Sequence, residues 1–267
     1  MNNTKKVIIA ANWKMNPVSS KEAKTLFEKV RSEVKRLRQK SIELIFCPPF
    51  VWLGDMKSAH SSEKSGIQLS LGAQDAFSET KGAFTGEISP LMLKNLGCQY
   101  VLLGHSERRK YLGETDEFIN QKIKTTIRCG LKPILCVGEE ERQDEENNSR
   151  SSQDINLIVG QQLKKALADI SVGKITNIMI AYEPVWAIGT GQPCSVDQAM
   201  KATLFIRKIL TDLYKRQVAE QVKVLYGGSV TAKNAADYVI EARMDGLLVG
   251  GASLSATEFI KIIKVVS

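Results

Sequence analysis

Eight short apolar segments recur along the chain, and a stretch with the residue spacing of an amphipathic helix follows each of them. The first such stretch carries Ala23, Leu26, Val30, Val34 and Leu37. Strands that are apolar on both faces and alternate with helices are typical of a parallel sheet covered by helices. The pattern therefore predicts an α/β fold whose strands cover residues 7–11, 42–46, 67–73, 100–103, 131–137, 178–182, 222–226 and 246–249.

Closure of this sheet would give a (β/α)₈ or TIM barrel, a fold that accommodates eight such units in about 250 residues. An open, doubly wound sheet is the alternative, but no GxGxxG sequence follows the first apolar run. We therefore predict one barrel domain over residues 1–267, with a closed parallel sheet and outer helices. Capping boxes are expected to open two of the helices, at Ser195 with Gln198 and at Ser255 with Glu258.

The composition limits the class of protein and its chemistry. Hydrophobic residues make up 43% of the chain and charged residues 25%, as in ordinary globular proteins. No apolar stretch is long enough for a signal peptide or a membrane span, so we expect a cytoplasmic protein without a membrane partner. The five cysteines contain no CxxC pair and the two histidines are far apart, so we expect reduced thiols, with no disulfide framework and no metal site.

The net charge of +8 suits an acidic partner, either a phosphorylated small molecule or a nucleic acid. Lysines and arginines mix with glutamates in helical stretches such as residues 21–40, which is typical of a solvated helix surface. The chain lacks the interleaved aromatic and basic residues of RNA-binding proteins. We predict a small phosphorylated ligand and no nucleic acid; salt-sensitive DNA binding would favour the alternative.

Glu183 occupies an unusual position for an acid. The apolar run 178–182 ends just before it, and Pro184 disfavours helical backbone angles at Glu183 itself. Apolar residues at 185–188 then lie among prolines and glycines, in a segment that would otherwise be a water-facing loop. This combination predicts a lid over Glu183 that excludes water. A surface acid followed by an apolar loop is the alternative.

Further polar residues and glycines follow other predicted strands. In a barrel, all the loops that follow strands open on the same face. Taken singly, a histidine in such a place is more often structural, a lysine is more often a surface charge, and a glycine pair is more often a turn. Their common position at strand ends favours one active site built from Asn12, Lys14, His105, Glu183, Ser229, Gly250 and Gly251.

Five segments, in chain order, resemble the triosephosphate isomerase family: AANWKMN (10–16), GHSERR (104–109), AYEPVWAIGTG (181–191), YGGSV (226–230) and LVGGASL (248–254). The resemblance covers nearly the whole chain. It implies an intramolecular aldose–ketose isomerase that interconverts dihydroxyacetone phosphate and glyceraldehyde 3-phosphate in glycolysis and gluconeogenesis. It implies an enediolate intermediate and no cofactor.

The resemblance also implies the roles of individual residues. Glu183 matches the family's base, and a neutral His105 matches the donor to the substrate oxygen that becomes negative. Lys14 matches the cation that balances the phosphate and this oxygen, and Asn12 matches a positioning group. The phosphate is expected at backbone N–H groups of four further residues, Gly189, Ser229, Gly250 and Gly251. Supporting roles fall to Ser106 and Glu107 in the GHSERR segment.

Another phosphate-binding barrel, such as an aldolase with a Schiff-base lysine, is the alternative enzyme. It fits less well, because the sixth predicted strand ends in Glu183 and no second lysine stands at a neighbouring strand end. Two features depart from the family pattern. Gln192 stands where many members have lysine, which bears on the lid hinge, and an acidic insert at 139–152 is expected to be a solvated loop.

The segment after the third predicted strand, GAQDAFSETKGAFTGE at 72–87, is long for a strand-to-helix connection. Its GAFTGE portion resembles the family's interdigitating loop, which enters the partner subunit beside Asn12 and Lys14. The resemblance therefore implies an obligate homodimer with Phe84 and Thr85 at the contact. A loop folded back on its own barrel is the alternative.

Overall fold

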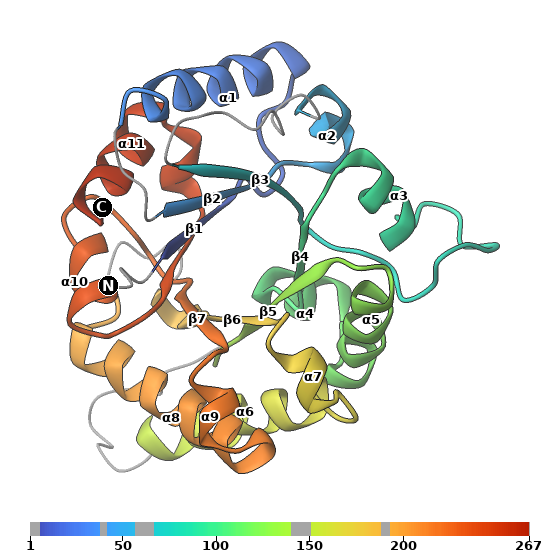
Figure 1. Cartoon of the computed structure of the whole chain (residues 1–267), viewed down its shortest axis with the longest axis vertical. Coiled ribbons are helices and arrows are strands. Elements are labelled where there is room, and N and C mark those ends of the chain that lie inside the picture. Colours follow the sequence, from blue (N-terminus) through green and yellow to red (C-terminus); the bar gives the residue numbers. More distant parts are fainter. Residues whose placement is uncertain (1–5, 38–41, 57–66, 140–150, 188–192, 267) are drawn as a thin grey trace.

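The strands form a closed barrel in which each strand runs parallel to both of its neighbours (Figure 1). The computed structural model describes residues 6–37, 42–56, 67–139, 151–187 and 193–266, and the side chains of these residues except at 151–156. The strands are β1 (Val7–Asn12), β2 (Ile42–Cys47), β3 (Gln68–Ala73), β4 (Tyr100–Leu103), β5 (Lys132–Val137), β6 (Met179–Tyr182), β7 (Lys223–Tyr226) and β8 (Gly246–Val249).

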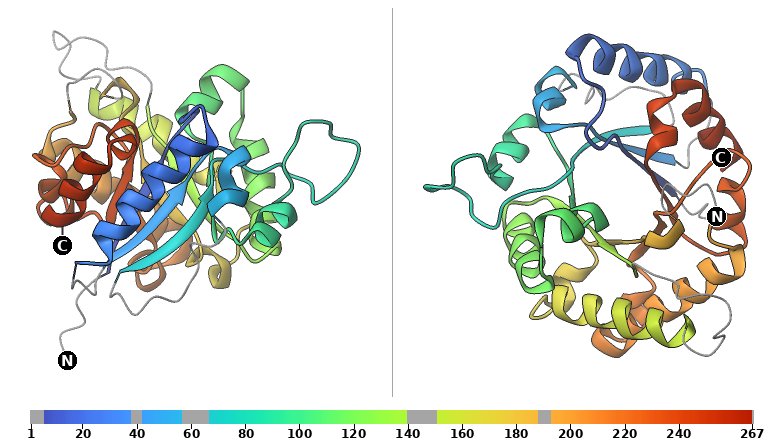
Figure 2. Two further views of the ribbon diagram at one scale, coloured as in Figure 1. Left: turned by 90° about the horizontal axis from the view of Figure 1, so that it is seen from above. Right: turned by 180° about the vertical axis from the view of Figure 1, so that it is seen from behind.

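Helices surround the barrel on its outside (Figures 1 and 2). Short 3-10 turns, η2 (Val185–Ala187) and η3 (Gly251–Leu254), follow β6 and β8. The α-helices are α1 (Ser20–Val34), α2 (Phe50–Met56), α3 (Pro90–Leu96), α4 (Ser106–Leu112), α5 (Asp116–Arg128), α6 (Ser151–Ala166), α7 (Val172–Ile175), α8 (Val196–Tyr214), α9 (Arg216–Ala219), α10 (Ala235–Ile240) and α11 (Ala256–Val265).

Successive residues of each strand belong to two different cores. Ile8 and Ala10 of β1 join a cluster inside the barrel, whereas Ile9 and Ala11 join the larger cluster between strands and helices. Because strand side chains alternate in direction, a strand buried on both faces must be apolar throughout. This is the reason that the strands are visible in the sequence. All eight predicted strands are confirmed to within two residues, and the closed barrel is confirmed over the open sheet.

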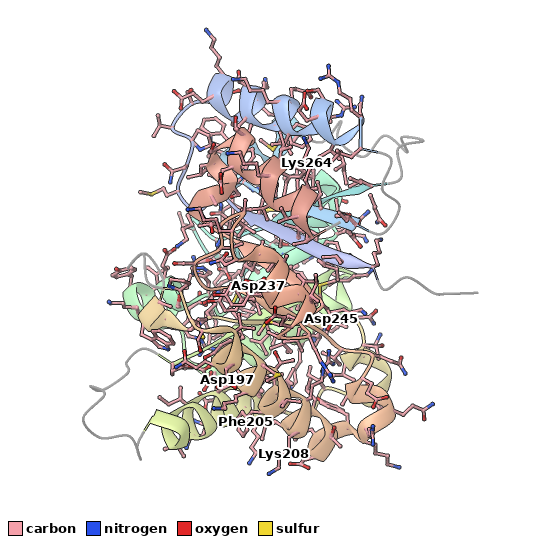
Figure 3. The ribbon with its side chains drawn as sticks, turned by 90° about the vertical axis from the view of Figure 1, so that its left-hand side faces the viewer. Asp197, Phe205, Lys208, Asp237, Asp245 and Lys264 are labelled. Atoms are coloured by element: carbon pink, nitrogen blue, oxygen red, sulfur yellow. The ribbon has the colours of Figure 1, made fainter. Side chains whose placement is uncertain are left out.

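The outer helices bury one face each, as their spacing predicts. In α8, Ala199, Ala202 and Ile206 are buried, whereas Asp197 and Lys208 lie on the exposed face (Figure 3). Among the helices that the structure describes, none is both long and apolar enough to cross a membrane.

One of the two predicted capping boxes is complete. Ser195 accepts from the backbone N–H of Gln198, and the Gln198 side chain accepts from the backbone N–H of Ser195. The prediction at Ser255 is wrong in part. Ser255 caps α11 through the backbone N–H of Glu258, but the Glu258 carboxylate accepts instead from the backbone N–H of Ala232, 3.0 Å away. Glu258 therefore binds the loop after β7 instead of the N-cap residue of its own helix.

The connection between β3 and α3 projects away from the barrel (Figures 1 and 2). Every residue from 81 to 87 is exposed in this chain. The Phe84 ring packs against Phe77 with ring centroids 4.7 Å apart, yet Phe84 remains 44% exposed. The loop thus has a small internal contact but leaves an aromatic side chain uncovered.

Candidate active site

The predicted site residues that the structure describes all follow strands at one end of the barrel. Asn12 ends β1, His105 follows β4, Glu183 follows β6, and Gly250 follows β8. In a parallel barrel the carboxyl ends of all strands lie on one face, so these residues share that face. The remaining members are Lys14 after β1, Ser106 and Glu107 at the start of α4, Ser229 after β7, and Gly251 at the start of η3. Gly189 and Gln192 lie outside the described residues.

Glu183 is held in place by the backbones of the neighbouring strands. Its N–H donates to the carbonyl of Val137 at the end of β5 over 2.8 Å. A Cβ atom on Gly138 would lie only 1.7 Å from the Glu183 carbonyl oxygen, and one on Gly227 would lie 3.0 Å from Glu183 Cγ. Only glycine permits this approach at position 138, so the backbone just after β5 packs directly against the backbone of Glu183.

The Glu183 carboxylate is buried, with 1% of the residue exposed, and its two oxygens differ. Oε2 accepts from the backbone N–H of Ser106 over 2.9 Å. Oε1 lies 3.2 Å from Nε2 of His105, but the contact is not aligned as a hydrogen bond. A carboxylate that holds one oxygen in place and keeps the other without an aligned donor can accept a proton there.

The hydrogen bonds of His105 identify its tautomer. His105 is the N-cap residue of α4, and its Nδ1 accepts from the backbone N–H of Glu107 over 3.2 Å. A nitrogen that accepts a hydrogen bond carries no proton, so the proton of a neutral imidazole is on Nε2. Nε2 faces Glu183, and the ring therefore presents one N–H donor to the site.

Lys14 has an uncommon backbone conformation. Its φ angle is +52°, in the left-handed region that non-glycine residues adopt rarely. Two polar contacts hold it there. Its N–H donates to Asn12 Oδ1 over 3.0 Å, and its carbonyl accepts from Nε2 of Gln74 over 2.7 Å. The Lys14 ammonium lies 2.6 Å from Glu107 Oε1, which places a positive charge beside the first turn of α4.

The loops after β7 and β8 bring a serine and two glycines to the same face. A Cβ atom on Gly250 would lie 3.4 Å from Cε of Lys14, so this glycine packs against the lysine stem. The Ser229 hydroxyl donates to the carbonyl of Ala187 over 2.7 Å. Ser229 thereby connects the loop after β7 to η2, the first turn of the segment that follows Glu183.

Glu139 contributes to the site although the sequence analysis placed it in a solvated insert. That expectation is wrong for Glu139, which is 1% exposed. Its Oε1 accepts from the Tyr182 hydroxyl at 2.9 Å and from the Trp186 indole N–H at 2.8 Å, while its carbonyl accepts from Val185. The insert prediction also failed at its end, because α6 begins at Ser151. Residues 140–150 lie outside the described part of the chain.

Three further residues support the site and were not predicted from the sequence. Gln74 supports Lys14, Gln162 bonds to Gly138, and Cys136 of β5 lies beside Glu183. Burial, followed by the nearby Glu183 carboxylate, raises the pKa of the Cys136 thiol well above its usual range, so the thiol stays protonated. Glu139 had a usable signal, since it follows a strand as Glu183 does. The two glutamines had none, because their partners are backbone groups far along the chain.

A cavity of about 290 Å³ adjoins Glu183 on the side of β5 and α6. The residues that line it are Gly104, Ser106, Arg109, Val137, Gly138, Ile158, Gln162, Glu183 and Val185. Arg109 in this wall makes three hydrogen bonds, to Asp116 and to the carbonyls of Gly104 and Cys136. The face thus combines a buried carboxylate, an imidazole, a lysine cation and glycine-rich loops. This set can move a proton next to a polarised carbonyl and hold an anion.

A family model described as triosephosphate isomerase matches residues 7–266 of the chain. Curated relatives with the same name align over nearly their entire length. The relative from Dehalococcoides mccartyi strain BAV1 is 46% identical over 258 residues, which cover 97% of this chain and 95% of the relative. The relative from Endomicrobium trichonymphae is 43% identical, with 97% and 98% covered. The relative from Thermoanaerobacter pseudethanolicus is 44% identical, with 96% and 98% covered.

Proposed function

The chain belongs to the triosephosphate isomerase family, and on this premise we propose that it interconverts dihydroxyacetone phosphate and glyceraldehyde 3-phosphate through an enediolate. It is an isomerase, so the substrate is rearranged within one molecule. The reaction moves a proton between two adjacent carbons and another between their oxygens. One base can serve both carbons because they are neighbours.

Glu183 is the base in this proposal. It removes the proton from the carbon next to the carbonyl and returns it to the adjacent carbon. Its burial and the absence of an aligned donor on Oε1 support the role, because a desolvated carboxylate with a free lone pair is a good proton acceptor. The Ser106 N–H holds the other oxygen and so fixes the orientation of the carboxylate.

His105 and Lys14 stabilise the charge that develops on the substrate oxygens. The neutral imidazole donates from Nε2, and the ammonium balances the negative charge of the enediolate and the phosphate. Asn12 positions the substrate next to Lys14. The support for these roles is the Nδ1 hydrogen bond of His105 and the backbone contact between Asn12 and Lys14.

The phosphate binds to backbone N–H groups of Ser229, Gly250 and Gly251, with Gly189 of the lid as the fourth member. The loops after β7 and β8 are the usual phosphate site of such barrels. The contact of Gly250 with the Lys14 stem supports this location, because it brings a cation within reach of the same anion. Glu107 balances the Lys14 ammonium when no substrate is bound.

The segment after Glu183 acts as a lid that excludes water from the enediolate. Its first turn, η2, is anchored on one side through Trp186 to Glu139 and on the other through Ala187 to Ser229. An exposed enediolate would expel its phosphate instead of being reprotonated. The lid therefore protects the intermediate as well as the base.

We also infer an obligate homodimer in the cytoplasm. The long loop after β3 leaves Phe84 44% exposed, and Met15, next to Lys14, is 90% exposed. The length of this loop and the family resemblance support a partner contact that would cover these two side chains. A partner loop placed there would cover Met15 and support Lys14. The five cysteines are all free thiols, as is usual for proteins of a reducing compartment.

The 3.2 Å approach of His105 Nε2 to the buried Glu183 carboxylate at the strand ends carries the proposal. The direct test is a coupled assay of both substrates, in both directions, with chelator present and no added metal. Interconversion in both directions is the expected result. Absence of turnover at saturating substrate in a folded sample would overturn the proposed reaction.

A further inference from the structure

We propose that Gln162 is a positioning residue for the isomerase reaction, and this inference rests on the function proposed above. Gln162 lies on α6, and its carboxamide bonds to the backbone of Gly138 rather than to a residue assigned to substrate. Its carboxamide instead holds the turn after β5, and that turn holds both Glu183 and the first turn of the lid. The argument depends on three consecutive residues, Val137, Gly138 and Glu139.

The Gln162 side chain binds Gly138 at two points. The Gly138 N–H donates to Oε1 over 2.8 Å, and Nε2 donates to the Gly138 carbonyl over 3.0 Å. The two bonds fix the peptide groups on both sides of Gly138, much as a neighbouring strand would. β5 has just ended at this point, so no strand partner supplies these bonds.

The turn at residues 137–139 accepts hydrogen bonds from the backbone of Glu183 and of Val185, two residues later. The carbonyl of Val137 accepts from Glu183 N over 2.8 Å, and the carbonyl of Glu139 accepts from Val185 N over 3.1 Å. Gly138 lies between them, where a Cβ atom would meet the Glu183 carbonyl oxygen at 1.7 Å. A shift of Gly138 therefore moves Glu183 directly. It also moves the Glu139 side chain, which binds Trp186 of η2.

The chemistry of the contact requires a carboxamide of this length. Leucine has a similar shape but can neither donate nor accept. Glutamate can accept from the Gly138 N–H, but as a carboxylate it would place an oxygen against the Gly138 carbonyl. Gln161 offers a matched control, because it precedes Gln162 on the same helix and is exposed.

The test compares Q162L, Q162E and the control Q161L in the coupled isomerase assay. A misplaced catalytic group costs up to about 100-fold in rate. We expect Q162L to lower kcat by about 10- to 100-fold, to change KM less than about threefold, and to release more methylglyoxal per turnover. Q161L should match the wild type in all three quantities.

Q162E adds a second measurement, the pH dependence of kcat, which would not change if Gln162 only stabilised the fold. A protonated carboxyl can donate to the Gly138 carbonyl, whereas a carboxylate cannot. The ratio of wild-type kcat to Q162E kcat should therefore shrink as the pH falls toward 5, while the ratio for Q162L stays constant. Q162E alone decides the question if Q162L does not fold.

The outcomes separate the two proposals. If the wild type and Q161L fail to interconvert the trioses, the proposed function is wrong. If both are active and Q162L keeps a kcat within about twofold of theirs, the positioning role of Gln162 is wrong. A kcat loss in Q162L that matches its unfolded fraction, with no pH dependence of the Q162E ratio, also overturns it.

Discussion

At the scale of single residues, Glu183 and Lys14 both adopt arrangements that depend on partners elsewhere in the chain. Lys14 keeps a left-handed backbone, a conformation that costs about 1–3 kcal/mol and persists only when neighbours impose it. Asn12 and Gln74 impose it through the Lys14 N–H and carbonyl. The side chain of Glu183 is buried, and its carboxylate accepts one hydrogen bond from a backbone group, the N–H of Ser106. Both arrangements are typical of functional positions.

Replacement of Glu183 by glutamine tests the base. E183Q keeps the shape and an oxygen that can accept from Ser106, but it removes the proton acceptor. We expect kcat to fall by at least about 10³, within the range for loss of a general base, with little change in melting temperature. Steady-state kinetics and thermal unfolding of the same sample measure both. A kcat within tenfold of the wild type would exclude Glu183 as the base.

Asp75 belongs to a buried ion cluster behind the site. Lys122 Nζ lies 2.8 Å from Asp75 and 2.5 Å from Glu114, and Arg108 lies within 2.9 Å of both carboxylates. Burial raises the pKa of Asp75 to about 6, because Lys122 and Arg108 offset the loss of water only in part and Glu114 repels the charge. Asp75 precedes α3 and follows Gln74, so the cluster supports the loop that holds Lys14.

The raised pKa predicts a pH-dependent stability difference. The folded protein binds the Asp75 proton more tightly than the unfolded chain, so ionisation of Asp75 lowers stability as the pH rises from about 4 to about 6. D75N cannot ionise and escapes this loss. Its stability relative to the wild type should therefore improve by roughly 2 kcal/mol between pH 4.5 and pH 7.5.

Urea unfolding at the two pH values, at equal protein concentration, measures this difference. D169N is the control, because the side chain of Asp169 is 87% exposed and its ionisation is coupled weakly to folding. An unchanged difference between D75N and the wild type across this range would show that Asp75 is ionised equally easily in both states.

At the scale of elements, the turn after β5 and the 3-10 turn after β6 work as a pair. The buried Glu139 carboxylate joins them, since it accepts from Tyr182 at the end of β6 and from Trp186 in η2. The buried Tyr182 hydroxyl and the indole N–H of half-buried Trp186 therefore share one acceptor atom. The position of η2, where the proposed lid begins, therefore depends on the turn after β5 as well as on its own sequence.

Substitution of Glu139 tests this anchor. E139L would leave the Tyr182 hydroxyl and the Trp186 N–H without their acceptor, at a cost of about 1–3 kcal/mol for each buried group. We expect a lower melting temperature and a several-fold rise in methylglyoxal per turnover, because the lid closes less well. E139Q keeps an acceptor oxygen and should show a smaller rise. Equal product partition in E139L and the wild type would mean that Glu139 does not control the lid.

At the scale of the whole molecule, the loop after β3 projects away from its own barrel (Figure 1). Its tip at residues 81–87 is exposed, and Phe84 contacts only its own loop through Phe77 among the described aromatic pairs. An apolar loop tip of this kind is stabilised when a second subunit covers it. The proposed homodimer rests on this exposure together with the family resemblance.

Charged residues at the loop tip test the dimer. The double variant F84E/T85E should be a monomer by analytical ultracentrifugation, with a melting temperature that no longer depends on concentration and a kcat at least about tenfold lower. L204E is the control, because Leu204 on α8 is also exposed, at 59%, but lies on the outer helical layer. A fully active monomer would show that each barrel completes its site alone.

The sequence by itself determined the order and position of the strands, the closed barrel and the strand-end location of the site. It could do so because a strand buried on both faces must be apolar along its whole length, and because parallel strands bring their carboxyl ends to one face. Glu183, His105 and Lys14 were visible since each stands within three residues of the end of such a run. The incomplete capping box at Ser255 and Glu258 shows where such prediction fails. The spacing of the two residues does not reveal that the backbone N–H of Ala232, in another loop, donates to the Glu258 carboxylate.

Only the tertiary structure decided which groups support these residues. The left-handed backbone of Lys14 and the burial of Glu139 depend on partners that are distant along the chain. Gln162 and Gln74 bind backbone carbonyl and N–H groups, which every residue carries and which therefore leave no mark on the sequence. The spacing of apolar residues indicates which side chains are buried. Which backbone group a polar side chain binds is decided only when the chain folds.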